Sequence, residues 1–76
     1  MQTTKISQAD IIQHANLMSN LPYQKAYEMY RVCLKEYGAY STVIIVRLAE
    51  IYKKTKCGQI KRAEAVRLQS EVLKWI

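Results

Sequence analysis

Residues 43–56 read VIIVRLAEIYKKTK and include Val43 to Val46, the longest uninterrupted apolar run in the chain. That run alone would fit a buried strand. However, apolar residues continue at helical spacing for three more turns, and no second strand-like run exists with which to pair. We therefore predict a central helix from Tyr40 or Ser41 to Lys56. Its core face comprises Ile44, Ile45, Leu48, Ala49, Ile51 and Tyr52.

Two helices are predicted before this one. Ser7 and Asp10 form a capping-box-like start for a first helix, which Ser19, Asn20 and Pro22 end. A second helix runs from about Leu21 to Tyr37 and ends at Gly38, a residue typical of the position after a helix. One face of the second helix carries Tyr23, Ala26, Tyr27, Tyr30, Cys33, Leu34 and Tyr37. We interpret this face mainly as core packing; the alternative for its tyrosines is a stacking platform for single-stranded nucleic acid or a protein contact.

A last helix is predicted from Ile60 to Ile76, after a turn at Gly58. Its polar face consists of charged residues spaced three and four apart, which need no functional explanation: Glu64, Arg67, Glu71 and Lys74. The 76 residues suffice for one domain, residues 1–76. The predicted fold is all-α, a compact bundle of three or four short helices joined by tight turns. We place Ile44, Ile45, Leu48, Ile51, Leu68 and Val72 at its centre.

Catalytic and metal-dependent functions find little support in the sequence. His14 is the only histidine, and Asp10 four residues earlier predicts a surface ion pair on one helix face. Neither an activated nucleophile nor a Gly-rich phosphate loop accompanies it. Cys33 and Cys57 match no zinc or disulfide pattern and are expected to be free thiols. We therefore expect a non-enzymatic protein without cofactor or metal.

The sequence also contains no apolar segment long enough to span a membrane and no recognisable targeting signal. Residues 1–8 contain one Lys and no long apolar run, and Val43 to Val46 is far too short to span a bilayer. The expectation from these patterns is a cytoplasmic protein that does not associate with membranes.

Positive charge is concentrated in the last third of the chain. The net charge is +6, and residues 51–76 carry seven Lys and Arg against Glu64 and Glu71. Lys53, Lys54 and Lys56 lie in the last turn of a predicted helix, where cations complement the helix dipole. Lys61 and Arg62 begin the next helix, where cations are unfavourable unless an anion binds nearby. The alternative interpretation of the cluster is a solvated turn between helices.

This pattern predicts a small DNA- or RNA-binding accessory or regulatory protein that contacts the phosphate backbone. The predicted contact residues are Lys53, Lys54, Lys56, Gln59, Lys61, Arg62 and Arg67. The alternative is an adaptor or inhibitor, of the kind that phages and mobile elements encode, that docks an acidic surface of a larger protein. A homodimer is also expected for so small a chain. Candidate interface residues are Tyr40, Val66, Leu73 and Trp75.

Overall fold

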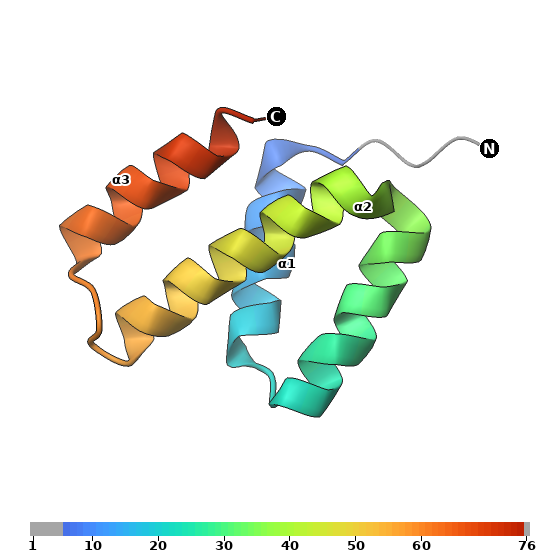
Figure 1. Ribbon diagram of the computed structural model, residues 1–76, viewed down its shortest axis with the longest axis horizontal. Coiled ribbons are helices and arrows are strands. Elements are labelled where there is room, and N and C mark those ends of the chain that lie inside the picture. Colours follow the sequence, from blue (N-terminus) through green and yellow to red (C-terminus); the bar gives the residue numbers. More distant parts are fainter. Residues whose placement is uncertain (1–5, 76) are drawn as a thin grey trace.

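The computed structural model describes residues 6–75, which contain three α-helices and no strand. Helix α1 covers Gln8–Asn20, α2 covers Tyr23–Lys56 and α3 covers Arg62–Leu73. Figure 1 shows α2 bent sharply near its middle, with α1 crossing behind its second half and α3 returning beside that half. The all-α prediction is therefore confirmed, and the bend turns three helices into four straight segments.

Gly38 produces the bend in α2. Its backbone has φ 88° and ψ 170°, a region that is essentially restricted to glycine. The predicted helix end at Tyr37 is therefore correct, but no loop follows, because the chain continues directly as helix. The hydroxyl of Thr42 donates a 2.7 Å hydrogen bond to the Gly38 carbonyl and closes the first turn after the bend. We refer to residues 23–37 and 39–56 as the first and second segments of α2.

The start of α1 follows the predicted capping pattern. Ser7 Oγ accepts a 3.2 Å hydrogen bond from the backbone N–H of Asp10. Ile6 and Ile11, which flank the cap, are both buried, as expected for a hydrophobic staple. Pro22 then precedes α2 at its N-cap position and separates the two helices.

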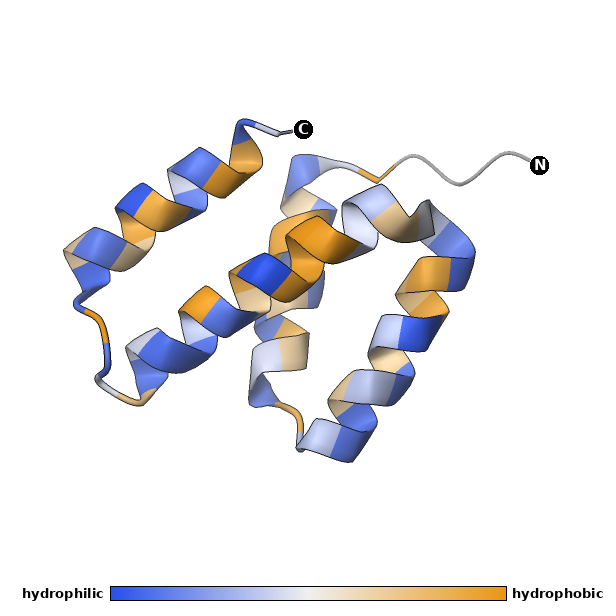
Figure 2. Ribbon diagram, in the orientation of Figure 1, coloured by the Kyte–Doolittle hydropathy of each residue, from blue (hydrophilic) through white to orange (hydrophobic). Residues whose placement is uncertain are grey.

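The core lies where the second segment of α2 crosses α1. Figure 2 shows the most hydrophobic part of α2 at this crossing. Thr42 is fully buried with these apolar residues, which its hydrogen bond to Gly38 permits. Two residues predicted for the centre, Ile44 and Ile45, are 1% and 0% exposed. The buried residues of the two helices are Ile11, Ala15, Met18, Ser19, Cys33, Thr42, Ile44, Ile45, Leu48, Ala49 and Ile51.

Helix α3 is less buried than predicted. Leu68 and Val72, which we expected at the centre, are only partly buried, and Ala65 is the one buried residue of α3. The reason is that α3 packs against α2 alone over most of its length, in a molecule only 15 Å thick along its shortest axis. Val43 is likewise 50% exposed, so the first turn of the central helix is not surrounded by neighbours.

Two hydrogen bonds connect α2 with α3 and the residues after it, where few apolar side chains are buried. Tyr52 Oη donates a 2.6 Å hydrogen bond to Gln69 Oε1 and connects α2 with α3. Tyr40 Oη donates to the backbone carbonyl of Trp75, just beyond α3. These contacts hold α3 alongside the second segment of α2.

Candidate functional site

The turn between α2 and α3 has a defined geometry. Gly58 has φ 78°, the left-handed conformation that glycine adopts readily. The N–H of Gln59 donates to the Lys54 carbonyl at 2.9 Å, and the N–H of Gly58 donates to the Thr55 carbonyl at 3.1 Å. These two hydrogen bonds make a Schellman motif, which closes the last turn of α2. The predicted turn residue is therefore correct, and the flanking cations have fixed positions.

Four cations surround this turn and form no ion pair within the part of the chain that the structure describes. Lys53 and Lys54 come from the last turns of α2, Lys61 is the N-cap residue of α3, and Arg62 is its first residue. All four are exposed, and none forms an ion pair with another residue in the range 6–75. We call these four residues the basic tip; the exposed side chain of Gln59 lies between them in sequence.

Lys56, unlike the neighbouring lysines, forms hydrogen bonds with another helix. Its ammonium group donates a 3.0 Å hydrogen bond to Ser19 Oγ and a second one to Asn20 Oδ1. It thereby joins the end of α2 to the end of α1. Lys56 was predicted as a contact residue, and the structure places it between two helices rather than among the unpaired cations.

Arg67 is also paired within the chain. Its guanidinium group lies 3.0 Å from Glu71 and 4.0 Å from Glu64, one turn away on either side along α3. These pairs are exposed and stabilise α3 weakly. Arg67 therefore belongs to the charged face of α3, and the structure does not bring it into the basic tip.

The start of α3 carries no side-chain cap. Lys61 occupies the N-cap position with extended backbone angles and makes no capping hydrogen bond. The first backbone N–H groups of a helix have no intrahelical acceptor, and the helix dipole favours negative charge there. Glu64 is the only acidic residue in this first turn. The positive end of α3 thus adds to the charge of the basic tip.

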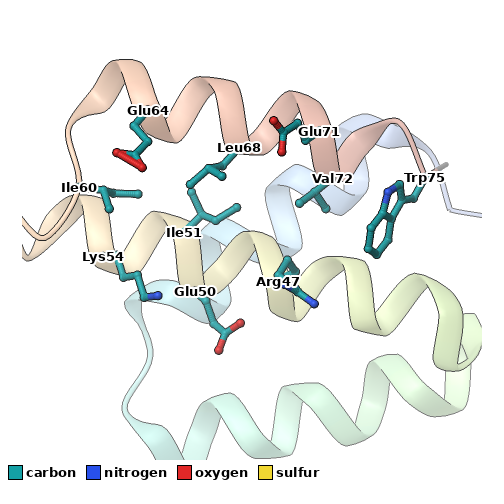
Figure 3. A pocket seen from close by; sticks show the side chains of 10 residues that line it. All are labelled: Arg47, Glu50, Ile51, Lys54, Ile60, Glu64, Leu68, Glu71, Val72 and Trp75. Carbon is teal, nitrogen blue, oxygen red and sulfur yellow. The ribbon is translucent and has the colours of Figure 1, made fainter.

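A groove lies on one side of the α2–α3 pair (Figure 3). It has a volume of about 470 Å³, and we call it the hairpin groove. The side chains of Leu68, Val72 and Trp75 point into it from α3 and the residues after it (Figure 3). Ile51 and Ile60 complete its apolar floor. Charged residues of both helices form its rims: Arg47, Glu50, Lys54, Glu64 and Glu71.

A second cavity of about 340 Å³ is lined by other residues of the same helix pair and by Asn16 of α1. Tyr52 and Gln69, joined by their hydrogen bond, line it together with Lys56 and Arg62. Val66 lines it as well and is 58% exposed. The cavity therefore borders the basic tip at Arg62.

The four candidate interface residues do not share one surface. Trp75 lines the hairpin groove, whereas Val66 lines the second cavity. Leu73 packs partly buried against the core. Tyr40 is 63% exposed and donates its hydrogen bond to the Trp75 carbonyl. Only Tyr40 and Trp75 are thus brought together, at the end of α3 opposite the basic tip.

Two tyrosines are more exposed than the sequence indicated. Tyr23 is 82% exposed and Tyr27 is 51% exposed, so neither belongs to the core. The rings of Tyr27 and Tyr30 stack with centroids 6.0 Å apart. The buried side of the first segment of α2 centres on Cys33, and the outer tyrosines lie on its flank. The apolar face of this segment on the helical wheel is therefore wider than the part that its neighbours cover.

His14 does not form the predicted ion pair with the Asp10 carboxylate. Its Nδ1 instead lies 2.7 Å from the backbone carbonyl of Asp10. A carbonyl oxygen can only accept a hydrogen bond, so Nδ1 carries the proton. The ring also meets the edge of Tyr37, with centroids 5.5 Å apart. His14 thus has a packing role.

The two cysteines are free thiols, as predicted, and they have opposite environments. Cys33 is buried and Cys57 is exposed. Burial, and next the nearby charge of Glu36, raise the pKa of the Cys33 thiol. Within the described range 6–75, no group of three or more His, Cys, Asp or Glu side chains is placed to hold a metal ion. Nor does any helix in that range have the length and apolar character needed to cross a membrane.

No protein-family model matches the chain, and no curated protein or solved structure shows significant similarity to it.

Proposed function

We propose that the protein binds the phosphate backbone of DNA or RNA through the basic tip, as a non-enzymatic accessory or regulatory protein. The observation that carries this proposal is the set of four exposed cations at one end of the α2–α3 pair, none of which forms an ion pair with a described residue. Phosphate contacts depend on Lys and Arg and on backbone N–H groups at helix starts. Both occur together at Lys61 and Arg62.

The position of the tip favours nucleic acid over an acidic protein. A protein interface derives most of its energy from a few aromatic anchors near its centre. Tyr40 and Trp75 lie at the opposite end of α3, and the 12 residues of that helix span about 18 Å at 1.5 Å per residue. The exposed aromatic side chains of Tyr40 and Trp75 are thus separated from the basic tip, which suits a binding mode that depends on charge.

Binding to a labelled random-sequence duplex, and to single-stranded RNA, at about 50 and 200 mM salt tests the proposal. Four phosphate contacts predict a slope of about −3 to −4 for the logarithm of the binding constant against that of the salt concentration. The variant in which Lys53, Lys54, Lys61 and Arg62 are all replaced by Ala is expected to lose this binding.

A matched control removes the same amount of charge elsewhere. Replacing Lys25, Arg31, Lys35 and Lys74 with Ala also changes the net charge from +6 to +2 (6 − 4 = 2). All four are exposed and lie outside the tip. The control variant is expected to retain most of the binding. Equal loss in the two variants, or no binding to either nucleic acid at low salt, would refute the proposal in favour of an acidic protein partner.

A further inference from the structure

The hairpin groove is an apolar surface that the chain itself leaves uncovered. Trp75 is 54% exposed there, and Leu68 and Val72 are only partly buried. A large aromatic residue beside aliphatic side chains in a concave surface is typical of a protein contact. The question is what covers it, and the charges on its two rims identify one occupant.

The charged residues of the two helices beside the groove alternate in opposite patterns. Along α2, the rim residues are Arg47, Glu50 and Lys54, which is positive, negative, positive. Along α3, in the reverse direction, the charged residues are Glu71, Arg67 and Glu64, which is negative, positive, negative, although Arg67 does not itself line the groove. Glu71 and Glu64 line the groove, and Arg67 lies between them with an ion pair to each.

The complementary rims do not satisfy each other within one chain. No ion pair joins α2 to α3 in the range 6–75; the two ion pairs there lie within α3, between Arg67 and the two glutamates. Figure 3 shows Arg47 and Lys54 on the α2 side, with Glu64 and Glu71 opposite them on α3. A second molecule that fills the groove is complementary to it if it presents negative charge to Arg47 and Lys54 and positive charge to the acidic residues of α3.

We propose that the hairpin groove binds a second copy of this chain, so that two α2–α3 pairs form an antiparallel four-helix bundle. A two-fold axis parallel to the helices places α2 of each copy over α3 of the other. Arg47, Glu50 and Lys54 then face Glu71, Arg67 and Glu64 of the second copy. The apolar floors, including both Trp75 side chains, close the interior.

The charge pattern also selects this arrangement over the other two-fold pairing. An axis perpendicular to the helices, in the plane of the interface, would place α2 over α2 in opposite directions. Arg47 would then face Lys54 of the second copy, and the two Glu50 side chains would meet. Like charges in contact across an interface are strongly unfavourable. The α2-over-α3 pairing converts every one of these contacts into an attractive one.

Two charge-reversed variants test this pairing, measured by sedimentation equilibrium without nucleic acid. The wild-type chain is expected to form a species of twice its 8.9 kDa mass. Arg47→Glu and Glu71→Arg are each expected to raise the dimer dissociation constant by about tenfold or more, because each creates two like-charge contacts per dimer. Both residues are exposed, and circular dichroism verifies that each variant remains folded.

Mixing the two variants in equal amounts distinguishes contacts between copies from contacts within one chain. Each variant alone retains like charges across its own groove, so only pairing between different copies can restore attraction. The mixture is expected to form a heterodimer with near wild-type affinity. A wild-type chain that stays monomeric up to about 200 µM, far above the micromolar dissociation constant of a weak dimer, would overturn the proposal. So would tighter association of Arg47→Glu, or a mixture that remains monomeric.

This proposal does not depend on nucleic-acid binding. Arg47 and Glu71 lie outside the basic tip, and the measurement contains no nucleic acid. Lys54 belongs to both the basic tip and the α2 rim of the groove, but neither dimerisation variant changes it. Failure of dimerisation would leave nucleic-acid binding by the tip untested by this measurement, and loss of tip binding does not enter a measurement without nucleic acid. The two experiments therefore fail separately.

Discussion

The ammonium group of Lys56 donates a hydrogen bond to Ser19 Oγ at 3.0 Å, across 37 positions of sequence. Lys56 differs in this respect from Lys53 and Lys54. Both are close to it in sequence, but neither has such a partner among residues 6–75. Neighbouring cations of one cluster thus have different roles. Some hold the fold together, and the others remain available to a ligand.

We expect Lys56→Met to lower the free energy of unfolding by about 0.5–1 kcal/mol, because the hydrogen bonds to α1 are lost at a largely exposed position. Lys53→Met is the control and is expected to change stability by less than about 0.5 kcal/mol. Urea unfolding followed by circular dichroism measures both values. The effects on nucleic-acid binding are expected to be the opposite. Lys53→Met should reduce the salt dependence of the binding constant by about one phosphate contact, and Lys56→Met should leave it unchanged. The same stability for both variants would contradict the structural role of Lys56.

The two glycines with positive φ provide a second comparison. Gly38→Ala is expected to cost about 1–3 kcal/mol of stability, because φ 88° with ψ 170° is a region almost closed to other residues. Gly58→Ala is expected to cost about 1–2 kcal/mol, since it requires only the left-handed helical conformation. No atom lies within 4 Å of a Cβ added at Gly58, so its cost is purely conformational. Thermal unfolding ranks the two variants. A neutral Gly38→Ala would show that α2 is straight in solution.

Removal of the Tyr52 hydroxyl tests the connection between α2 and α3. Tyr52→Phe is expected to lose about 0.5–1.5 kcal/mol of stability with the hydrogen bond to Gln69. Tyr23→Phe is the matched control, because Tyr23 is 82% exposed, and we expect it to be neutral. If Tyr52→Phe unfolds at the same urea concentration as Tyr23→Phe, the connection is not formed.

The same residue predicts a change of stability at alkaline pH. Burial raises the pKa of the Tyr52 phenol above its ordinary value of 10.0. The unfolded chain therefore releases this proton first, and stability is complete below the ordinary pKa and falls as the pH rises through the folded-state value. Burial, followed by the charge of Glu36, also raises the pKa of Tyr37. Tyr52→Phe should thus reduce, without abolishing, the loss of stability as the pH rises above the ordinary phenol pKa of 10.0; an unchanged loss would exclude Tyr52 as a contributor.

The cysteines provide a chemical measure of the fold. Cys57 is exposed in the α2–α3 turn and is expected to react rapidly with a chromogenic disulfide reagent at about pH 8. Cys33 is buried and its thiol pKa is raised, so it should react only when the chain unfolds. One rapid equivalent per chain is the expected result, and Cys57→Ser should remove it. Two rapid equivalents would show that α1 does not cover Cys33.

Local patterns sufficed to predict most of the helix boundaries. Ser7, Gly38 and Gly58 act through backbone geometry and short-range hydrogen bonds, which are encoded within a few residues. Their roles could therefore be predicted before the structure was known. The concentration of Lys53, Lys54, Lys61 and Arg62 around one turn followed from the same boundaries.

The degree of burial could not be predicted in this way. Periodicity identifies which side of a helix is apolar, but the neighbour that covers this side is set by tertiary packing. Leu68 and Tyr27 fit the apolar side of their helices, yet Leu68 is only partly buried and Tyr27 is exposed. The partner of Lys56 was hidden for the same reason, because Ser19 is distant in sequence and is brought near only by the crossing of α1 and α2.

The one-sided packing of α3 has a consequence for the order in which the chain opens. Since α3 rests on α2 alone over most of its length and buries only Ala65 completely, its separation exposes far less apolar surface than the separation of α1 from α2. Amide protons of α3 should therefore exchange with solvent through local unfolding. Those around Ile45 and Leu48 should exchange only through global unfolding. A second copy in the hairpin groove would slow exchange in α3 first, so the protection of this helix would rise with protein concentration.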